Sequence, residues 1–260
     1  MIHRIFNFSP GPAVLPEEVV AEARDNLLSL GATGIGILEI SHRSKEFEAI
    51  MAETEANLRT LLGLTADYRV LFLTGGASLQ FSMVPMNLLK AGQTADYIVT
   101  GEWSKRSIQE AGKYCTVNIA ASSRASGYTH IPPRESWKLD PNAAYVHICA
   151  NETIGGVEYH FTPDTGSVPL VADMSSNILS RPIDVSKYGL IYAGAQKNIG
   201  PAGLTLVFVR DDLLDRALPI CPSAFEYKTV AEHGSMFNTP PTYGIYIAGL
   251  VFQWLKRQGG

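Results

Sequence analysis

Short apolar runs alternate with amphipathic stretches along most of the chain. Seven runs rich in β-branched and aromatic residues have the length of strands, and they predict strands at residues 69–73, 97–99, 114–119, 144–149, 168–172, 190–193 and 204–209. Segments with helical spacing of apolar residues lie between several of these runs. This alternation predicts an α/β fold with a mainly parallel, seven-stranded sheet flanked by helices.

Capping residues mark where the helices begin. Pro16 suits the first position of a helix, and acidic Glu17 and Glu18 suit its dipole. This helix is expected to close before Gly31 with three leucines: Leu27, Leu28 and Leu30. Ser44 predicts the N-cap of a second helix with an apolar stripe. Further helices are expected at residues 78–89, 104–111 and 243–257.

The composition is that of an ordinary globular protein. Of the 260 residues, 46% are hydrophobic and 18% are charged, with 25 acidic against 21 basic side chains and a net charge of −4. Because no long basic run is present, we expect no nucleic-acid partner. No apolar stretch has the length of a membrane span, and we expect no membrane association.

The cysteines and the first residues indicate the cellular compartment. Cys115, Cys149 and Cys221 are odd in number and lie mostly within apolar segments, which favours free thiols over disulfides or a metal site. Residues 1–10 lack the continuous apolar core of a signal peptide. We therefore expect a cytoplasmic protein without a metal centre.

Lys197 is the residue with the clearest chemical meaning. It lies in a short turn between two strand-length apolar runs, and small residues surround it on both sides. Burial of an amine lowers its pKa and leaves it nucleophilic, as a lysine that forms a Schiff base with pyridoxal phosphate must be. Taken alone, such a lysine would more often be a surface residue at the end of a strand.

Other polar or aromatic residues also follow predicted strands, at the edge where ligands bind in open α/β sheets. Ser78, after Gly75 and Gly76, can help to hold a phosphate at a helix N-terminus, although a plain tight turn is equally consistent. Trp103 can stack on a planar ring or pack in the core. Thr153 and Asp173 can bind ring atoms or cap turns. Their succession at neighbouring strand ends predicts one cofactor site.

Several short segments together resemble the phosphoserine aminotransferases. The resemblance runs through essentially the whole chain and rests on residues 7–12, 41–44, 75–78, 172–176, 195–198 and 237–242. It implies a class-V aminotransferase of fold type I that works as a homodimer with shared active sites and uses pyridoxal 5′-phosphate. The implied reaction moves an amino group from glutamate to 3-phosphohydroxypyruvate in serine biosynthesis, and a related oxo acid of pyridoxine biosynthesis is a second implied substrate.

The resemblance also implies the roles of individual residues. Lys197 would bond to the cofactor and move protons, and Asp173 would pair with the pyridine nitrogen. The other implied cofactor-binding residues are Ala77, Ser78, Trp103, Thr153 and Gln196, with Asn238 and Thr239 reaching the neighbouring subunit's cofactor. The implied substrate-binding residues are Ser9, His42 and Arg43. Without the resemblance, His42 and Arg43 would be interpreted as a solvated entrance to a helix.

We expect residues 1–15 to form an N-terminal substrate-site segment and residues 16–260 a large cofactor-binding domain. The family's small C-terminal domain is expected to be absent, which puts substrate affinity and turnover in doubt. Three alternatives stay open: another class-V enzyme such as an alanine–glyoxylate aminotransferase or a cysteine desulfurase, a cofactor-binding form impaired in catalysis, and a nicotinamide-dependent enzyme. The last is disfavoured because residues 75–78 lack the Gly-x-Gly-x-x-Gly pattern.

Overall fold

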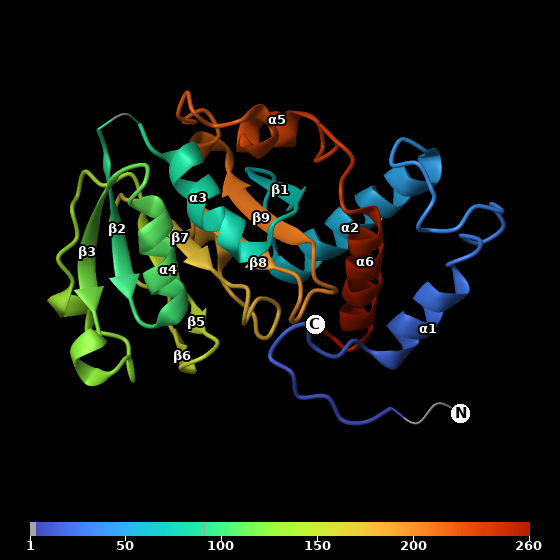
Figure 1. The fold of residues 1–260 in the computed structure, drawn as a ribbon, viewed down its shortest axis with the longest axis horizontal. Helices are drawn as coiled ribbons and strands as arrows, with labels where there is room; N and C mark the ends of the chain where they lie inside the picture. The colour runs from blue at the N-terminus through green and yellow to red at the C-terminus, as the bar shows by residue number, and fades with distance from the viewer. Residues whose placement is uncertain (1–3, 91) are drawn as a thin grey trace.

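The computed structural model describes residues 4–90 and 92–260. The first three residues of the predicted segment 1–15 therefore lie outside the described residues. A single large sheet runs through the molecule, with helices on both of its faces (Figure 1). Its strands are β1 Tyr68–Leu73, β2 Thr94–Val99, β3 Thr116–Ser122, β4 Val146–Cys149, β7 Leu170–Asp173, β8 Leu190–Gly194 and β9 Thr205–Arg210.

The sheet has the strand order β1-β9-β8-β7-β4-β2-β3. β9 is antiparallel to both of its neighbours, and the other pairings are parallel. The predicted α/β fold with a mainly parallel, seven-stranded sheet is therefore confirmed. A small antiparallel hairpin, β5 Asn151–Glu152 with β6 Val157–Glu158, was not predicted. Its strands have two residues each, too short for a periodic pattern to be recognised.

Six α-helices flank the sheet within the described residues: α1 Glu17–Asp25, α2 Lys45–Leu62, α3 Gly76–Leu88, α4 Glu102–Ala111, α5 Tyr227–Glu232 and α6 Thr242–Arg257. Single turns of 3-10 helix lie at Arg124–Ser126, Arg134–Ser136, Val185–Lys187, Asp211–Leu213 and Ser223–Phe225. The predicted N-cap is confirmed, because the Ser44 side chain accepts a hydrogen bond from the Phe47 N–H. None of the helices among the described residues is long and apolar enough to cross a membrane.

The expected end of the first helix was wrong. α1 ends at Asp25, and the three leucines after it lie in irregular chain. Asn26 ends the helix because its side chain turns back to donate to the Glu22 carbonyl (3.0 Å) and also accepts from the Gly31 N–H (2.9 Å). These local bonds satisfy the backbone in a turn, so leucine spacing alone could not extend the helix.

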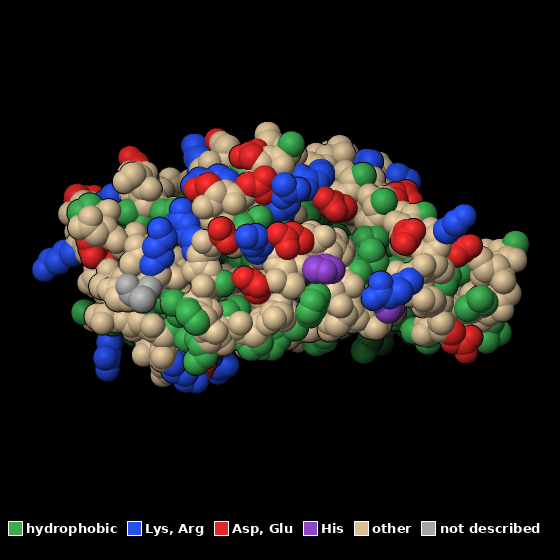
Figure 2. Space-filling model, turned by 90° about the horizontal axis from the view of Figure 1, so that it is seen from above, with side chains coloured by type: hydrophobic (Ala, Val, Ile, Leu, Met, Phe, Trp, Pro, Cys, Tyr) green, Lys and Arg blue, Asp and Glu red, His purple; other side chains and the backbone are tan. Residues whose placement is uncertain are grey.

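The alternation of side chains along the strands divides the core into two parts. In β1, Val70 and Phe72 belong to the core shared with α2 and α6, whereas Leu71 and Leu73 belong to the core shared with α3 and α5. On the face of the molecule shown in Figure 2, acidic and basic side chains are interspersed. The buried strands thus form a rigid platform whose carboxyl ends carry the loops described below.

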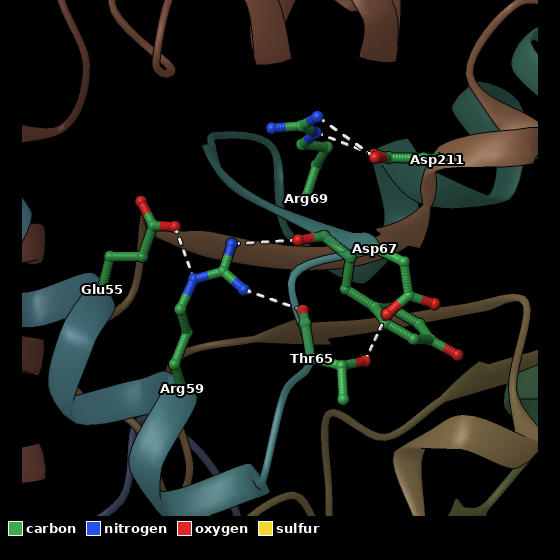
Figure 3. Close-up of polar contacts among 7 residues, drawn as sticks. Glu55, Arg59, Thr65, Asp67, Arg69 and Asp211 are labelled. Atoms are coloured by element: carbon green, nitrogen blue, oxygen red, sulfur yellow. Dashed lines mark hydrogen bonds and ion pairs between the residues drawn. The ribbon is translucent and has the colours of Figure 1, made fainter.

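The half-buried arginine Arg59 links α2 to β1 through hydrogen bonds (Figure 3). Arg59 donates to the Glu55 carboxylate (2.8 Å) and to the carbonyls of Thr65 (3.2 Å) and Tyr68 (2.9 Å). Hydrogen bonds from a charged donor contribute more than neutral ones, so we expect Arg59→Ala to lower the free energy of unfolding by about 2 kcal/mol. Urea unfolding monitored by circular dichroism measures this loss.

Arg69 provides the matched control, because the one side chain that its guanidinium binds among the described residues is the exposed carboxylate of Asp211 (2.7 Å; Figure 3). Exposed ion pairs contribute little, so Arg69→Ala is expected to cost less than about 1 kcal/mol. Arg59→Lys should not restore stability, since one ammonium group cannot occupy the three directions of the guanidinium fork. Equal losses of unfolding free energy in Arg59→Ala and Arg69→Ala would contradict the stabilising role given to the Arg59 hydrogen bonds.

Candidate active site

A cavity of about 370 Å³ lies where several strands end at the carboxyl edge of the sheet. Its size is within the range of small-molecule sites. It is lined by Pro10, Gly11, Gly76, Ala77, Ser78, Trp103, Cys149, Asn151, Thr153, Ile154, Asp173, Ser175, Ser176, Gln196 and Lys197. These residues come from the N-terminal segment, from the first turns of α3 and α4, and from the loops after β4, β7 and β8.

Lys197 enters this cavity from the turn between β8 and β9. Its Nζ donates a hydrogen bond to the Thr153 hydroxyl. Burial lowers the pKa of the Lys197 amine, and the nearby acidic groups of Asp173 and Cys149 partly oppose this effect. A larger fraction of the amine is therefore neutral and nucleophilic near pH 7 than for an exposed lysine.

Asp173 is the last residue of β7 and is only 5% exposed. Its Oδ1 accepts a hydrogen bond from the Ser175 N–H (2.9 Å). Burial raises the pKa of the Asp173 carboxyl, while hydrogen bonds from Ser175 and the Lys197 charge act in the opposite direction. A buried carboxylate beside a cavity is suited to a cationic N–H partner in a ligand.

The first turn of α3 forms the part of the cavity best suited to an anion. Gly75 and Gly76 both have positive φ angles, 89° and 65°, which glycine adopts without strain. A Cβ at Gly75 would also lie 2.5 Å from the Leu79 side chain. Small residues here leave the free N–H groups of the helix N-terminus accessible next to Ala77 and Ser78, as phosphate binding requires.

The structure brings together seven of the predicted site residues around the cavity: Ala77, Ser78, Trp103, Thr153, Asp173, Gln196 and Lys197. Asn238 and Thr239 do not line it; they line a separate small cavity beside α3 and α5. The three predicted substrate residues also lie outside the cavity lining. Ser9 and Arg43 are exposed, and His42 is half-buried with an unpartnered Nε2 among the described residues.

Some cavity residues were not predicted from the sequence. Pro10 and Gly11 reach the site because the Ala13 N–H donates to the Gln196 carbonyl (2.7 Å), which ties the N-terminal segment to the Lys197 turn. Cys149 ends β4 directly beside Asp173 in the parallel pairing. Its position at the end of a buried strand is a signal that could have indicated it.

A buried histidine lies in the sheet close to the site and makes the protein's stability depend on pH. His147 on β4 pairs through Nε2 with the Tyr192 hydroxyl (2.9 Å), and burial lowers the pKa of His147 to about 3. In the unfolded chain the pKa is about 6.5, so below that pH only the unfolded state binds this proton. Stability should therefore fall as the pH falls from about 6.5 towards 3.

The contribution of His147 can be separated by a variant that does not titrate. Between pH 7 and pH 5 the wild type is expected to lose about 2 kcal/mol more than His147→Gln, whose amide can still bond to Tyr192. Urea unfolding at both pH values measures the difference. Parallel losses in the two proteins would show that His147 is not the responsible group.

Comparison with known proteins identifies the class of protein to which this fold and cavity belong. Residues 5–260 match the family described as Aminotransferase class-V. The chain belongs to this family.

Within it, the chain is similar to phosphoserine aminotransferases. It is 61% identical to the phosphoserine aminotransferase of Herminiimonas arsenicoxydans over 260 residues, which is 99% of this chain and 72% of the relative. The solved phosphoserine aminotransferase of Bacillus circulans subsp. alkalophilus superimposes with a TM-score of 0.96 at 47% identity, over 99% of this chain and 71% of that one.

A structure of PLP-bound phosphoserine aminotransferase from Trichomonas vaginalis is similar too, with a TM-score of 0.94 and 41% identity over 99% of this chain and 76% of that one. The resemblance found in the sequence is therefore confirmed. Membership of a class-V aminotransferase family also implies pyridoxal phosphate as the cofactor.

The cavity residues fit that cofactor. Among the residues that the structure describes, no basic side chain forms a hydrogen bond with the buried Asp173 carboxylate. Lys197 is a part-buried amine, and the first turn of α3 contains no acidic residue. The buried Nε1 of Trp103 has no hydrogen-bond partner among the residues that the structure describes. These features together match a flat, cationic, phosphate-bearing ligand.

Proposed function

We propose that this chain catalyses transamination between glutamate and 3-phosphohydroxypyruvate, giving 2-oxoglutarate and O-phosphoserine. The observation that carries the proposal is the meeting of Lys197, Asp173 and Trp103 around one cavity, in a chain 61% identical to a phosphoserine aminotransferase. Pyridoxal phosphate, when bound, supplies an aldehyde for the amino group and a ring that withdraws electrons. The reaction would belong to serine biosynthesis in the cytoplasm, with a related oxo acid of pyridoxine biosynthesis as a second substrate.

The cofactor would be held by residues that line the cavity. Trp103 would supply a flat aromatic surface, and the Asp173 carboxylate would pair with the ring nitrogen and favour its protonated form. Thr153 supplies a hydroxyl beside Lys197. The phosphate would bind at the α3 N-terminus with Ala77, Ser78 and Gln196, where N–H groups and the helix dipole favour an anion.

Lys197 would act twice, first as the point of covalent attachment and then as the base that moves a proton. Its lowered pKa makes the neutral amine available, so the amine can take the proton from the substrate Cα and later return it. The hydrogen bond to Thr153 restricts where the amine can lie.

We propose that Ser9, His42 and Arg43 bind the substrate's anionic groups. Arg43 is exposed and carries a guanidinium fork that matches carboxylate or phosphate in a bidentate manner. Ser9 adjoins Pro10 and Gly11, which line the cavity, so its segment reaches the same space. Binding energy from these groups would orient the substrate at the reacting centre.

We also propose a homodimer in which Asn238 and Thr239 act on the partner's cofactor phosphate. In this chain both residues line a different cavity from Lys197, which is consistent with a role across an interface. The aromatic side chains of Phe6 and Phe8 are 91% and 90% exposed, and apolar surface of this kind favours association. Sedimentation at equilibrium tests this proposal, and a monomer at micromolar concentration would contradict it.

The reaction is tested by following the absorption of the purified chain with pyridoxal phosphate. We expect a yellow absorption band that bleaches when glutamate is added and returns when 3-phosphohydroxypyruvate is added. A band indifferent to glutamate would indicate cofactor binding without catalysis. A band that responds to alanine and glyoxylate, but not to glutamate, would favour an alanine–glyoxylate aminotransferase.

A further inference from the structure

The carboxylate of Glu152 is buried against the helix that carries Trp103. Glu152 is 0% exposed, and among the described residues the hydrogen-bond partners of its carboxylate belong to the first turn of α4. Oε2 accepts from the Trp103 N–H (2.9 Å), and Oε1 accepts from the Ser104 N–H (3.0 Å) and the Ser104 hydroxyl (2.5 Å). These bonds satisfy backbone donors that a helix N-terminus leaves free, and the dipole favours the negative charge.

The turn between β2 and α4 is shaped to admit this carboxylate. A Cβ at Gly101 would lie 2.6 Å from the Glu152 Cδ, so only glycine allows the carboxylate to come this close. The Ser104 hydroxyl in turn accepts from the N–H groups of Gly101 (3.0 Å) and Thr100 (2.9 Å). Glu152 is therefore the centre of a network that fixes where α4 begins.

This network joins two segments, the first turn of α4 and the β5–β6 hairpin that contains Glu152, and each segment carries a side chain that lines the cavity around Lys197. The backbone N–H of Trp103 is one of the three donors to the carboxylate, and Trp103 also lines the cavity. The guanidinium carbon of Arg106 lies over the Trp103 ring, 4.9 Å from the ring centroid. Thr153, the residue after Glu152, accepts a hydrogen bond from Lys197. One carboxylate thus holds the Trp103 helix against the loop that contacts the lysine.

We propose that Glu152 is a positioning residue that sets the Trp103 ring relative to Thr153 and Lys197 in the cofactor site. The proposal rests on the proposed cofactor site and adds a residue that contacts no ligand itself. Restricting a stacking ring in advance lowers the entropic cost of binding, since the ring need not be ordered when the cofactor arrives. Cofactor affinity should therefore depend on a carboxylate that the cofactor never touches.

Glu152→Gln tests this proposal because it keeps the size of the side chain but places an amide donor against backbone donors. We expect the dissociation constant of pyridoxal phosphate to rise at least tenfold, measured by absorption titration, with a weaker visible circular-dichroism band from the bound cofactor. In the cofactor-free protein, hydrogen exchange of the Trp103 and Ser104 amides should become faster. Glu102→Gln is the matched control, since Glu102 is in the same helical turn but pairs only with Lys105 among the described residues.

A second comparison separates positioning of the ring from general support of the fold. In a Trp103→Ala background, Glu152→Gln should change the dissociation constant by less than twofold, because the ring that it positions is gone. A tenfold loss in both backgrounds would overturn the proposal and assign Glu152 to fold stability alone. Wild-type affinity in Glu152→Gln, with normal binding by the wild type, would overturn it as well.

Glu152→Asp provides an independent variant should the glutamine variant fail to fold. It keeps the buried charge but is one methylene shorter, so it cannot reach both Trp103 and Ser104. A loss of affinity of the same order, confined to proteins that contain Trp103, would support positioning by the hydrogen bonds. Affinity unchanged in Glu152→Asp would overturn it. If the wild type itself binds no pyridoxal phosphate, that result contradicts both the proposed function and the positioning role of Glu152.

Discussion

Replacing Lys197 by alanine is expected to abolish the covalent link between the chain and pyridoxal phosphate that borohydride reduces. The half-reaction with glutamate should slow by at least about 10³-fold, because the variant loses its proton-transfer base as well as its point of attachment. Mass spectrometry of the reduced protein locates the link, and stopped-flow absorption measures the half-reaction. No other lysine lines the cavity formed by the described residues.

Lys113→Ala is the control for this experiment. Lys113 is exposed and paired with Glu110 on the outer surface of α4 and the turn that follows it, so its loss should leave both the link and the rate unchanged. A reducible link that persists in Lys197→Ala, attached to another lysine, would contradict the assignment of the site.

Replacing Asp173 by asparagine is expected to leave cofactor attachment possible but to slow the glutamate half-reaction by about 10²- to 10³-fold. Breaking a buried charge pair costs about 3–5 kcal/mol, and each 1.4 kcal/mol corresponds to a factor of ten. Without the carboxylate, the ring nitrogen is less readily kept protonated and the ring withdraws electrons less strongly. Single-turnover absorption measurements with saturating cofactor separate this slowing from weaker binding.

Asp215→Asn is the matched control, because Asp215 is 88% exposed and pairs with Lys228. It should behave as the wild type in both cofactor binding and rate. A glutamate half-reaction in Asp173→Asn that is as fast as in the wild type would exclude the proposed pairing of Asp173 with the ring nitrogen. A rate that recovers when the cofactor concentration is raised would assign Asp173 to binding instead.

Four residues that the sequence predicted to meet line one cavity, and they share one geometric property. Each lies at the end of a strand or shortly after one, as Asp173 and Lys197 do, and neighbouring parallel strands have their carboxyl ends at the same edge of the sheet. Local patterns were therefore sufficient to predict that they meet. The seven strands were predicted from short apolar runs, which are typical of strands in a mainly parallel sheet.

What the sequence could not provide are contacts between segments that have no common edge or period. Glu152 meets Trp103 across 49 residues, and nothing in either local pattern records that contact. The antiparallel orientation of β9 could not be predicted either, because the apolar pattern of a strand does not depend on the direction in which the strand pairs with its neighbours. Whether Asn238 and Thr239 reach a second subunit depends on an interface and stays a prediction.

The position of β1 in the sheet has a consequence for the order in which the protein can be completed during synthesis. Arg69 on β1 and Asp211, which follows β9, are 142 residues apart along the chain. At translation rates of about 5–20 residues per second, β1 leaves the ribosome roughly 7–30 s before its partner strand exists. The nascent chain must therefore carry an apolar strand with unpaired N–H and C=O groups for that interval, at the stage when association with other chains is hardest to avoid.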